Sequence, residues 1–314
     1  MIRKILASAA ACALSMTAMA VSGEKIVVGF SQIGAESAWR TAETISIKTE
    51  AEKRGIELIF SDAQQKQENQ IKALRNFIAM DVDVIGLAPV VESGWEPVLR
   101  EVQEAGIPVI LVDRKVNVSD ESLYESYLGP NVIEEGRNAA RWLAERMNGK
   151  ANIVELQGTV GSAPAIERKQ GFEGVIADYP GMRIVMSQSG DFTRAKGKEV
   201  MEQWVKSPDF RSVDAIFAHN DDMALGAVQA LEESGFRPGK DIVIVSIDGV
   251  RDAFVAMVDG KLNCTVECNP LLGPQFFNLV EKLAAGGSIP RWEESFEDVY
   301  DETVAAKALP ERLY

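Results

Sequence analysis

The chain has 314 residues, with 33 Lys and Arg against 47 Asp and Glu, which gives a formal net charge of −14. The length allows two domains, and 46% hydrophobic with 25% charged residues excludes a disordered chain and a multi-span membrane protein. The acidic balance without a basic run argues against nucleic-acid binding, and the single His disfavours His-based metal sites and Ser-His-Asp catalysis.

The first twenty residues have the pattern of a secretory signal peptide. Arg3 and Lys4 precede an Ala-rich apolar stretch, and Ala18 and Ala20 are small residues at the two positions that define a cleavage site. Lipidation at Cys12 is the alternative, but the three residues before it are alanines and include no Leu. We therefore expect cleavage after Ala20, export of the chain and release of its mature part.

Strand and helix patterns alternate along the rest of the chain. Short apolar runs predict strands, and amphipathic stretches, several of them followed by Gly, predict helices. The predicted strands span residues 25–30, 57–60, 84–88, 108–112, 152–156, 183–187, 215–218 and 242–246. The predicted helices span about 39–54, 67–80, 96–105, 132–147, 165–178, 194–206, 222–234 and 252–258. The tail adds a strand at 262–267, a helix at 271–285 and a last strand near 296–300.

The predicted strands are apolar throughout, which indicates burial on both faces and therefore parallel sheets covered by helices. Two such runs, separated near residues 127–130, predict an α/β protein with two doubly wound parallel-sheet lobes. We expect an N-terminal lobe of residues 24–127 and 267–295 and a C-terminal lobe of residues 128–266 and 296–314. Three chain crossings near residues 128, 262 and 296 would form a hinge, with a ligand cleft between the lobes.

Cys264 and Cys268 are the cysteines of the mature chain, and they belong to the predicted strand 262–267 or directly follow it. Four strand residues span about 13 Å, whereas a disulfide needs Cα atoms within about 7 Å. The secreted compartment favours a disulfide, but the geometry favours two free thiols. Two cysteines are too few for a Cys-rich metal site.

Polar and aromatic side chains gather in the loops that follow the predicted strands, where open α/β sheets bind their ligands. Asp, Asn and Arg side chains hydrogen-bond neighbouring hydroxyls, and aromatic faces pack against a sugar ring, so this set suits a sugar and requires no cofactor. In chain order the candidates are Ser37, Trp39, Arg40, Asp113, Arg114, Arg168, Phe192, Asn220 and Asp248.

Several motifs resemble the type I periplasmic sugar-binding proteins of ABC transporters, and the resemblance covers essentially all of the mature chain. They are Val112-Asp113-Arg114, Gly190-Asp191-Phe192-Thr193, His219-Asn220-Asp221-Asp222 and Ser246-Ile247-Asp248-Gly249. Residues 29–40, 64–71, 94–99 and 155–161 are similar to the galactofuranose-binding members in particular. The resemblance implies the type I fold with its three-crossing hinge, a monosaccharide ligand with galactofuranose as the leading candidate, an inner-membrane permease as partner, and a monomer without a cofactor.

The resemblance also implies a role for each candidate. Trp39 and Phe192 would stack on the sugar, and Ser37 and Arg40 would add contacts from the first loop. Hydrogen bonds would come from Asp113, Arg114, Arg168, Asn220 and Asp248. Ribose binders carry Gln in the hinge strand, where this chain has Glu267, so the resemblance implies that Glu267 also contacts the sugar.

Other functions are weighed against this one. The ligand could be ribose, galactopyranose or a sugar-like signal for a chemoreceptor. A glycosidase would need a carboxylate pair such as Asp113 and Asp248, but the neighbouring arginines would lower an acid's pKa where catalysis needs it raised, so we do not expect an enzyme. The export signal and the missing DNA-binding helices exclude a sugar-responsive repressor. Residues 190–198 lack the spacing of a phosphate loop, and His219 is expected to support its loop.

Overall fold

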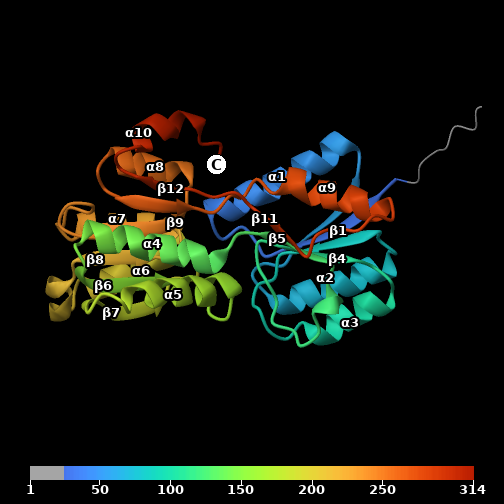
Figure 1. Ribbon diagram of the computed structural model, residues 1–314, viewed down its shortest axis with the longest axis horizontal. Helices are drawn as coiled ribbons and strands as arrows, with labels where there is room; N and C mark the ends of the chain where they lie inside the picture. Colours follow the sequence, from blue (N-terminus) through green and yellow to red (C-terminus); the bar gives the residue numbers. More distant parts are fainter. Residues whose placement is uncertain (1–24) are drawn as a thin grey trace, which may run out of the picture.

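The computed structural model describes residues 25–314, which form two lobes placed side by side (Figure 1). The expected signal peptide and Cys12 lie outside the described residues. Each lobe is a sheet with helices on both faces, so the predicted α/β class with two doubly wound lobes is confirmed. Among the described residues, no helix combines the length and the apolar character that crossing a membrane would need.

The first lobe contains a six-stranded sheet in the order β11-β5-β4-β3-β1-β2, and all its neighbouring strands are parallel. Its strands are β1 (Val27–Gln32), β2 (Glu57–Asp62), β3 (Val84–Leu87), β4 (Val109–Val112), β5 (Ser126–Gly129) and β11 (Trp292–Glu294). Its helices are α1 (Ala38–Arg54), α2 (Gln67–Ala79), α3 (Glu96–Glu104) and α9 (Gly273–Ala284).

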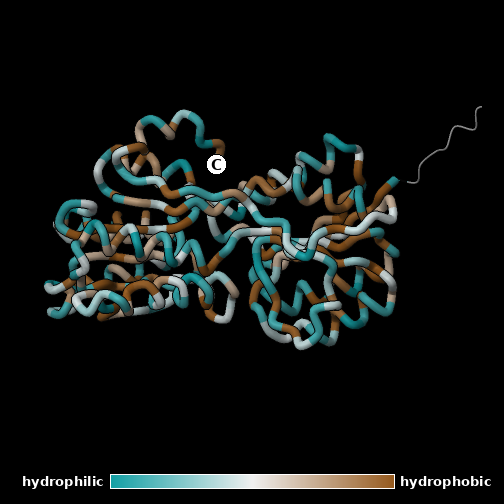
Figure 2. Tube along the Cα trace, viewed as in Figure 1, coloured by the Kyte–Doolittle hydropathy of each residue, from teal (hydrophilic) through white to brown (hydrophobic). Residues whose placement is uncertain are grey.

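Strand β4 shows why the first sheet is apolar throughout. Its residues Ile110 and Val112 pack in one core cluster with α1 and α9, whereas Val109 and Leu111 pack in another with α2 and α3. Because successive side chains point to opposite faces, a strand covered on both sides must be apolar at every position. The hydropathy along the trace shows the same pattern, with hydrophobic segments inside each lobe (Figure 2).

The second lobe repeats the architecture in the strand order β12-β10-β9-β8-β6-β7. Its strands are β6 (Lys150–Gln157), β7 (Gly181–Ser189), β8 (Ala215–Ala218), β9 (Val243–Asp248), β10 (Cys264–Glu267) and β12 (Val299–Asp301), and β12 alone is antiparallel to its neighbour. Its helices are α4 (Val132–Arg146), α5 (Ala163–Ile176), α6 (Arg194–Trp204), α7 (Asp221–Glu233), α8 (Arg251–Val258) and α10 (Ala305–Ala308). Short 3₁₀ turns cover Glu121–Leu123, Pro208–Ser212 and Leu309–Glu311.

The chain passes between the two sheets three times, from β5 to α4, from β10 to α9 and from β11 to β12. The second crossing follows Glu267, later than the position near residue 262 that the sequence suggested. These three segments lie together between the lobes (Figure 1). They are therefore the connections about which the lobes can rotate.

Two strands, β5 and β11, were not among the predicted elements. The separation of the lobes that was predicted near residues 127–130 falls at the end of β5, a buried strand of four residues. The last strand predicted near 296–300 corresponds to β12, whereas β11 precedes it and is separated from it by the exposed Phe296. Because β11 is a three-residue edge strand without an apolar run, the pattern gave no sign of it.

Candidate functional site

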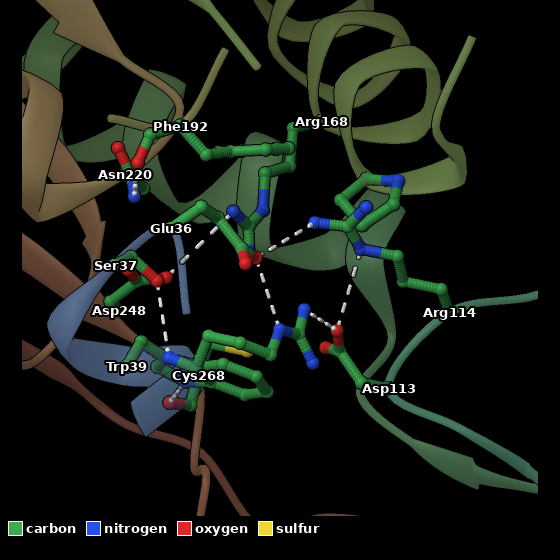
Figure 3. A pocket seen from close by; sticks show the side chains of 12 residues that line it. Glu36, Ser37, Trp39, Asp113, Arg114, Arg168, Phe192, Asn220, Asp248 and Cys268 are labelled. Carbon is green, nitrogen blue, oxygen red and sulfur yellow. Dashed lines mark hydrogen bonds and ion pairs between the residues drawn. The ribbon is translucent and has the colours of Figure 1, made fainter. Parts of the chain in front are cut away.

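A cavity lies between the lobes, where the loops at the carboxyl ends of both sheets face each other. The side chains that line it surround about 290 Å³ of space, part of which is open to solvent. The first lobe contributes Glu36, Ser37, Trp39, Arg40, Asp113 and Arg114, the second contributes Pro164, Arg168, Phe192, Asn220 and Asp248, and the second crossing contributes Cys268. Nine of the ten sequence-predicted residues therefore lie together (Figure 3).

The lobes touch each other beside this cavity. The backbone N–H of Ala38, at the start of α1, donates to the Asp222 carboxylate of α7 at 2.7 Å. The Lys115 ammonium lies 3.4 Å from the Glu167 carboxylate across the cleft. The described arrangement is therefore closed, and the cavity is walled by both lobes.

The first-lobe wall is a network of paired charges centred on Arg40. Its Nη2 donates to Asp113 Oδ2 at 2.6 Å and its Nε to Glu36 Oε1 at 3.1 Å, while Nη1 donates to Glu43. All three guanidinium nitrogens are thus occupied by carboxylates. Arg40 lines the cavity and also holds these carboxylates in place.

Arg114 and Glu36 each carry an unsatisfied atom of this wall, as does Glu43, which does not line the cavity. Arg114 Nη1 donates to the Val90 carbonyl at 3.1 Å, Nη2 lies 3.9 Å from Glu36, and Nε lies 3.5 Å from Asp113. Arg114 Nε and Glu36 Oε2 are both buried without a hydrogen-bond partner among the described residues. Burial lowers the pKa of Arg114 to about 10, so its guanidinium is charged at neutral pH. A buried donor and acceptor left open in a cavity indicate a polar ligand.

The second-lobe wall is built around Arg168 and Asp248. Arg168 donates through Nε to Glu135 at 2.8 Å and through Nη1 to the His219 carbonyl at 2.6 Å, which fixes its guanidinium. Arg168 Nη1 lies 3.8 Å from Asp248 Oδ1. The Asp248 carboxylate accepts no hydrogen bond from any residue in the range 25–314, and burial raises its pKa well above the usual value. Asp248 is therefore a buried carboxyl that faces the cavity and awaits a donor.

Two of the candidates also begin helices. Ser37 caps α1 by accepting from the Arg40 N–H, and Asn220 caps α7 by accepting from the Met223 N–H at 3.0 Å. The Asn220 amide also donates to the Phe192 carbonyl at 3.1 Å. Capping satisfies helix-end N–H groups and fixes these loops, so both side chains are held at the cavity by the start of a helix.

Trp39 and Phe192 form the apolar surfaces of the cavity, and both are 4% exposed. The Trp39 indole N–H donates to the Cys268 carbonyl at 2.5 Å, which fixes the ring. The Phe192 ring packs so closely against Gly158 that a Cβ atom at residue 158 would overlap it. The guanidinium carbon of Arg114 lies 5.2 Å from the centroid of the same ring. Both rings are held in fixed positions, as a stacking surface requires.

Three of the candidate residues have unusual backbone conformations, with φ of 65° at Asp113, 60° at Phe192 and 132° at Asp248. Positive φ in residues other than Gly is costly, and it concentrates at ligand sites, where the surroundings enforce it. This observation independently supports a functional role for the three loops.

Glu267 is the one sequence-predicted residue that the structure does not bring to the cavity. Its carboxylate pairs with Arg312 at 2.8 Å and accepts from the Tyr314 hydroxyl at 3.0 Å. Conversely, Glu36, Pro164 and Cys268 line the cavity and were not singled out from the sequence. Glu36 stood beside Ser37 in the same polar loop, which was the available signal.

Residues behind the cavity support it. His219 is buried and its Nε2 lies 3.1 Å from Glu155 Oε1, which agrees with the supporting role expected for it. Burial lowers the pKa of His219, so the ring is neutral near pH 7. The pair therefore orders the loop that ends β8 without adding a charge to the cavity.

Glu135, Cys268 and Glu297 form the one group of possible metal ligands within the described residues, with donor atoms within 4.8 Å of each other. Glu135 is already paired with the Arg168 guanidinium. Burial raises the pKa of Cys268 and of Glu297, so both hold their protons at neutral pH and are poor ligands. We assign no metal to this group, and the two cysteines are free thiols.

Comparisons with known proteins give a consistent picture. Residues 28–288 match the family described as periplasmic binding protein domain. The chain is 51% identical to the galactofuranose-binding protein YtfQ of Escherichia coli over 290 residues, which cover 92% of this chain and 90% of that protein.

Two solved structures are also similar. The periplasmic binding component of an arabinose ABC transporter from Shewanella sp. ANA-3, bound to L-arabinofuranose, has a TM-score of 0.89 and 51% identity, covering 91% of this chain and 95% of that one. A protein of Mycobacterium smegmatis in complex with β-D-fucofuranose has a TM-score of 0.88 and 49% identity, covering 91% and 94%.

Proposed function

The chain belongs to the periplasmic binding protein family and binds a monosaccharide without being an enzyme, and from this premise we propose that its ligand is a sugar in the furanose ring form, with galactofuranose as the leading candidate. Family membership implies a periplasmic protein that serves an ABC importer. The observation that carries the proposal is the cavity between the lobes, where buried polar atoms of Arg114 and Glu36 have no hydrogen-bond partner among the described residues and two aromatic rings are held in place.

The chemistry of the walls supports a neutral polyhydroxylated ligand. The charges of the first-lobe wall are paired with each other, so a charged ligand would have to displace buried ion pairs, which is costly. Hydroxyl groups can donate to Glu36 and Asp248 and accept from Arg114 without changing the charge balance.

The furanose ring form is supported by the relatives. The Shewanella and Mycobacterium smegmatis proteins are described with arabinofuranose and fucofuranose bound, and the Escherichia coli protein is named for galactofuranose. A hexofuranose has a five-membered ring with an exocyclic arm. We propose that the unpartnered Oε2 of Glu36 accepts a hydrogen bond from the ligand on the first-lobe side, in the loop where the sequence analysis expected contacts from Ser37 and Arg40.

The roles proposed for the other candidates follow from their positions. Trp39 and Phe192 cover the ring, Asp113 and Asn220 contribute from opposite lobes, and Asp248 accepts from ring hydroxyls. Because contacts come from both lobes, the ligand stabilises the closed arrangement, and the closed shape is what we propose the permease recognises. We further propose that the protein acts as a monomer.

Ring form can be tested directly with D-galactose labelled with ¹³C at C1. Free galactose exchanges between pyranose and furanose forms, whose C1 signals are distinct by NMR. Protein in excess over the sugar should enrich the furanose signal in the bound fraction, and calorimetry should show tighter binding of L-arabinose or D-galactose than of D-ribose. A bound fraction that contains only pyranose would overturn the furanose proposal, although binding itself would remain.

A further inference from the structure

The C-terminal segment, residues 309–314, packs against the back of the Asp248 loop, outside the cavity. Arg312 donates to the Gly249 carbonyl through both Nη2, at 2.8 Å, and Nε, at 3.2 Å. Its third nitrogen, Nη1, lies 2.8 Å from Glu267 Oε1. One side chain therefore joins the loop after β9 to the end of the hinge strand β10.

Arg312 is held in a fixed position by aromatic rings. Its guanidinium carbon lies 4.7 Å from the ring centroid of Phe254, 5.1 Å from that of Tyr300 and 4.8 Å from that of Tyr314. The Arg312 side chain is only 8% exposed. A charged group enclosed in this way loses hydration, so its hydrogen bonds to Gly249 and Glu267 must compensate for that loss.

Tyr314 completes the arrangement. Its hydroxyl donates to Glu267 Oε1 at 3.0 Å, and its main-chain oxygen accepts from the Arg251 N–H at 2.5 Å. The Glu267 carboxylate, which the sequence had placed at the ligand, is thus occupied by Arg312 and Tyr314.

The loop that these residues hold is the one with the most unusual backbone. Asp248 has φ of 132° and Gly249 has φ of 78°. From inside the lobe, Asp221 accepts from the N–H groups of Gly249 and Val250, both at 2.8 Å. From outside, Arg312 binds the Gly249 carbonyl. Asp248 and Glu267 are also paired in register across β9 and β10. The two groups that Arg312 binds, the Gly249 carbonyl and the Glu267 carboxylate, therefore both lie next to Asp248.

We propose that Arg312 and Tyr314 are positioning residues for sugar binding: they fix the Gly249 carbonyl and the Glu267 carboxylate, and through them hold Asp248 pointing into the cavity. The inference rests on the proposed role of Asp248 as a ligand contact. It also gives Glu267 a role in joining the hinge strand to the C-terminal segment instead of touching the sugar.

The test compares sugar affinity with ligand-free stability in single variants. Calorimetry with D-galactose and L-arabinose should show about tenfold weaker binding by Arg312→Ala, since the loop loses a charged hydrogen-bond donor. Arg312→Lys keeps the pair with Glu267 but not the twofold contact with Gly249, so it should recover part of the loss. Tyr314→Phe should weaken binding two- to threefold. The matched control is Arg237→Ala, which removes an exposed arginine paired with Asp241 and should change the Kd by less than twofold.

A merely structural role would lower the melting temperature of Arg312→Ala and leave its Kd unchanged at a temperature where it is folded, and that result would overturn the proposal. If Arg312→Ala does not fold, Tyr314→Phe and Arg312→Lys give the same comparison.

Combining Arg312→Ala with Asp248→Ala separates this proposal from the proposed function. If the double variant binds sugar hardly more weakly than Asp248→Ala alone, the result supports positioning through Asp248. If the losses of affinity in the two single variants add fully in the double variant, the result contradicts it. An unchanged Kd in Asp248→Ala itself would remove Asp248 from the ligand site and this inference with it. A loss in Asp248→Ala but none in Arg312→Ala or Tyr314→Phe would overturn only the positioning role.

Discussion

Arg40 of α1 donates to Asp113 at the end of β4 at 2.6 Å, and this buried contact joins the first loop of the cavity to the fourth strand of the same sheet. The same guanidinium holds Glu36 and Glu43. Three carboxylates around one cation are stable only while the cation is present, so Arg40 governs the shape of the whole first-lobe wall.

The first prediction follows from this arrangement. Arg40→Ala should lower both stability and sugar affinity, because removing one partner of a buried ion pair costs about 3–5 kcal/mol. Denaturant unfolding of the ligand-free protein measures the first effect and calorimetry the second. Arg237→Ala, at an exposed pair, is the control and should change neither appreciably. Normal stability with weakened binding would instead mean that Arg40 is a direct ligand donor.

Asp248 should behave in the opposite way. Its carboxylate accepts no hydrogen bond from a described residue and has only a 3.8 Å ion pair with Arg168, so Asp248→Ala should leave the ligand-free melting temperature within a few degrees. Sugar binding should weaken by about 30- to 1000-fold, which corresponds to about 2–4 kcal/mol for stranded polar partners. Asp248→Asn, which keeps the shape and tolerates the backbone conformation, should lose less. A Kd that stays the same in Asp248→Ala would exclude Asp248 from the site.

Glu36 provides a prediction that the sequence alone did not suggest. Glu36→Gln keeps the size of the side chain but removes the charge and replaces one acceptor oxygen with an NH₂ group. We expect about 10- to 150-fold weaker sugar binding, the equivalent of about 1.5–3 kcal/mol for a charged hydrogen bond. Glu92→Gln, outside the cavity lining, is a suitable control. Equal affinities for Glu36→Gln and the unchanged chain would show that the open oxygen faces no ligand group.

The fold was predictable because its signals are local. The run Val109–Val112 is apolar at every position since helices cover both faces of β4, and the same reasoning located most of the strands. The sheet rule then placed Asp113 and Asp248 at strand ends without any coordinates. The edge strand β11 was missed because an edge strand has fewer buried positions and thus no apolar run.

The partners of charged side chains were not predictable in this way. The role of Arg40 depends on Asp113, which is 73 residues away, and the orientation of Glu267 depends on Arg312 and Tyr314 in the last segment. Such pairs form only when the lobes are complete, so a sequence pattern can identify a candidate side chain but not what it binds.

The two thiols give a prediction about reactivity. Cys264 and Cys268 are buried and free, and burial raises the pKa of both. Because the thiolate is the reactive form, alkylation of the folded protein near neutral pH should be slow. After unfolding without reductant, mass spectrometry should show two modified thiols per mature chain. A mass two daltons lower with neither thiol modified would reveal a disulfide and contradict the strand geometry of β10.

Glu297 lies in the third crossing, and its protonation gives a pH prediction. Burial, reinforced by the nearby Glu135 carboxylate, raises the pKa of Glu297 to about 10. The folded chain therefore holds this proton more tightly than the unfolded chain, in which Glu titrates near about 4.3. A raised pKa of this kind contributes stability at low pH that is lost as the pH rises toward about 10.

Glu297→Gln keeps a neutral side chain at every pH and removes this dependence. The melting temperature of the variant minus that of the unchanged chain should therefore increase as the pH rises from about 5 to about 9. Glu294→Gln, at an exposed position in β11, is the matched control and should show no such trend. Thermal unfolding across this pH series decides the question: a difference between the Glu297→Gln variant and the unchanged chain that stays constant with pH would show that Glu297 is ionised in the folded hinge.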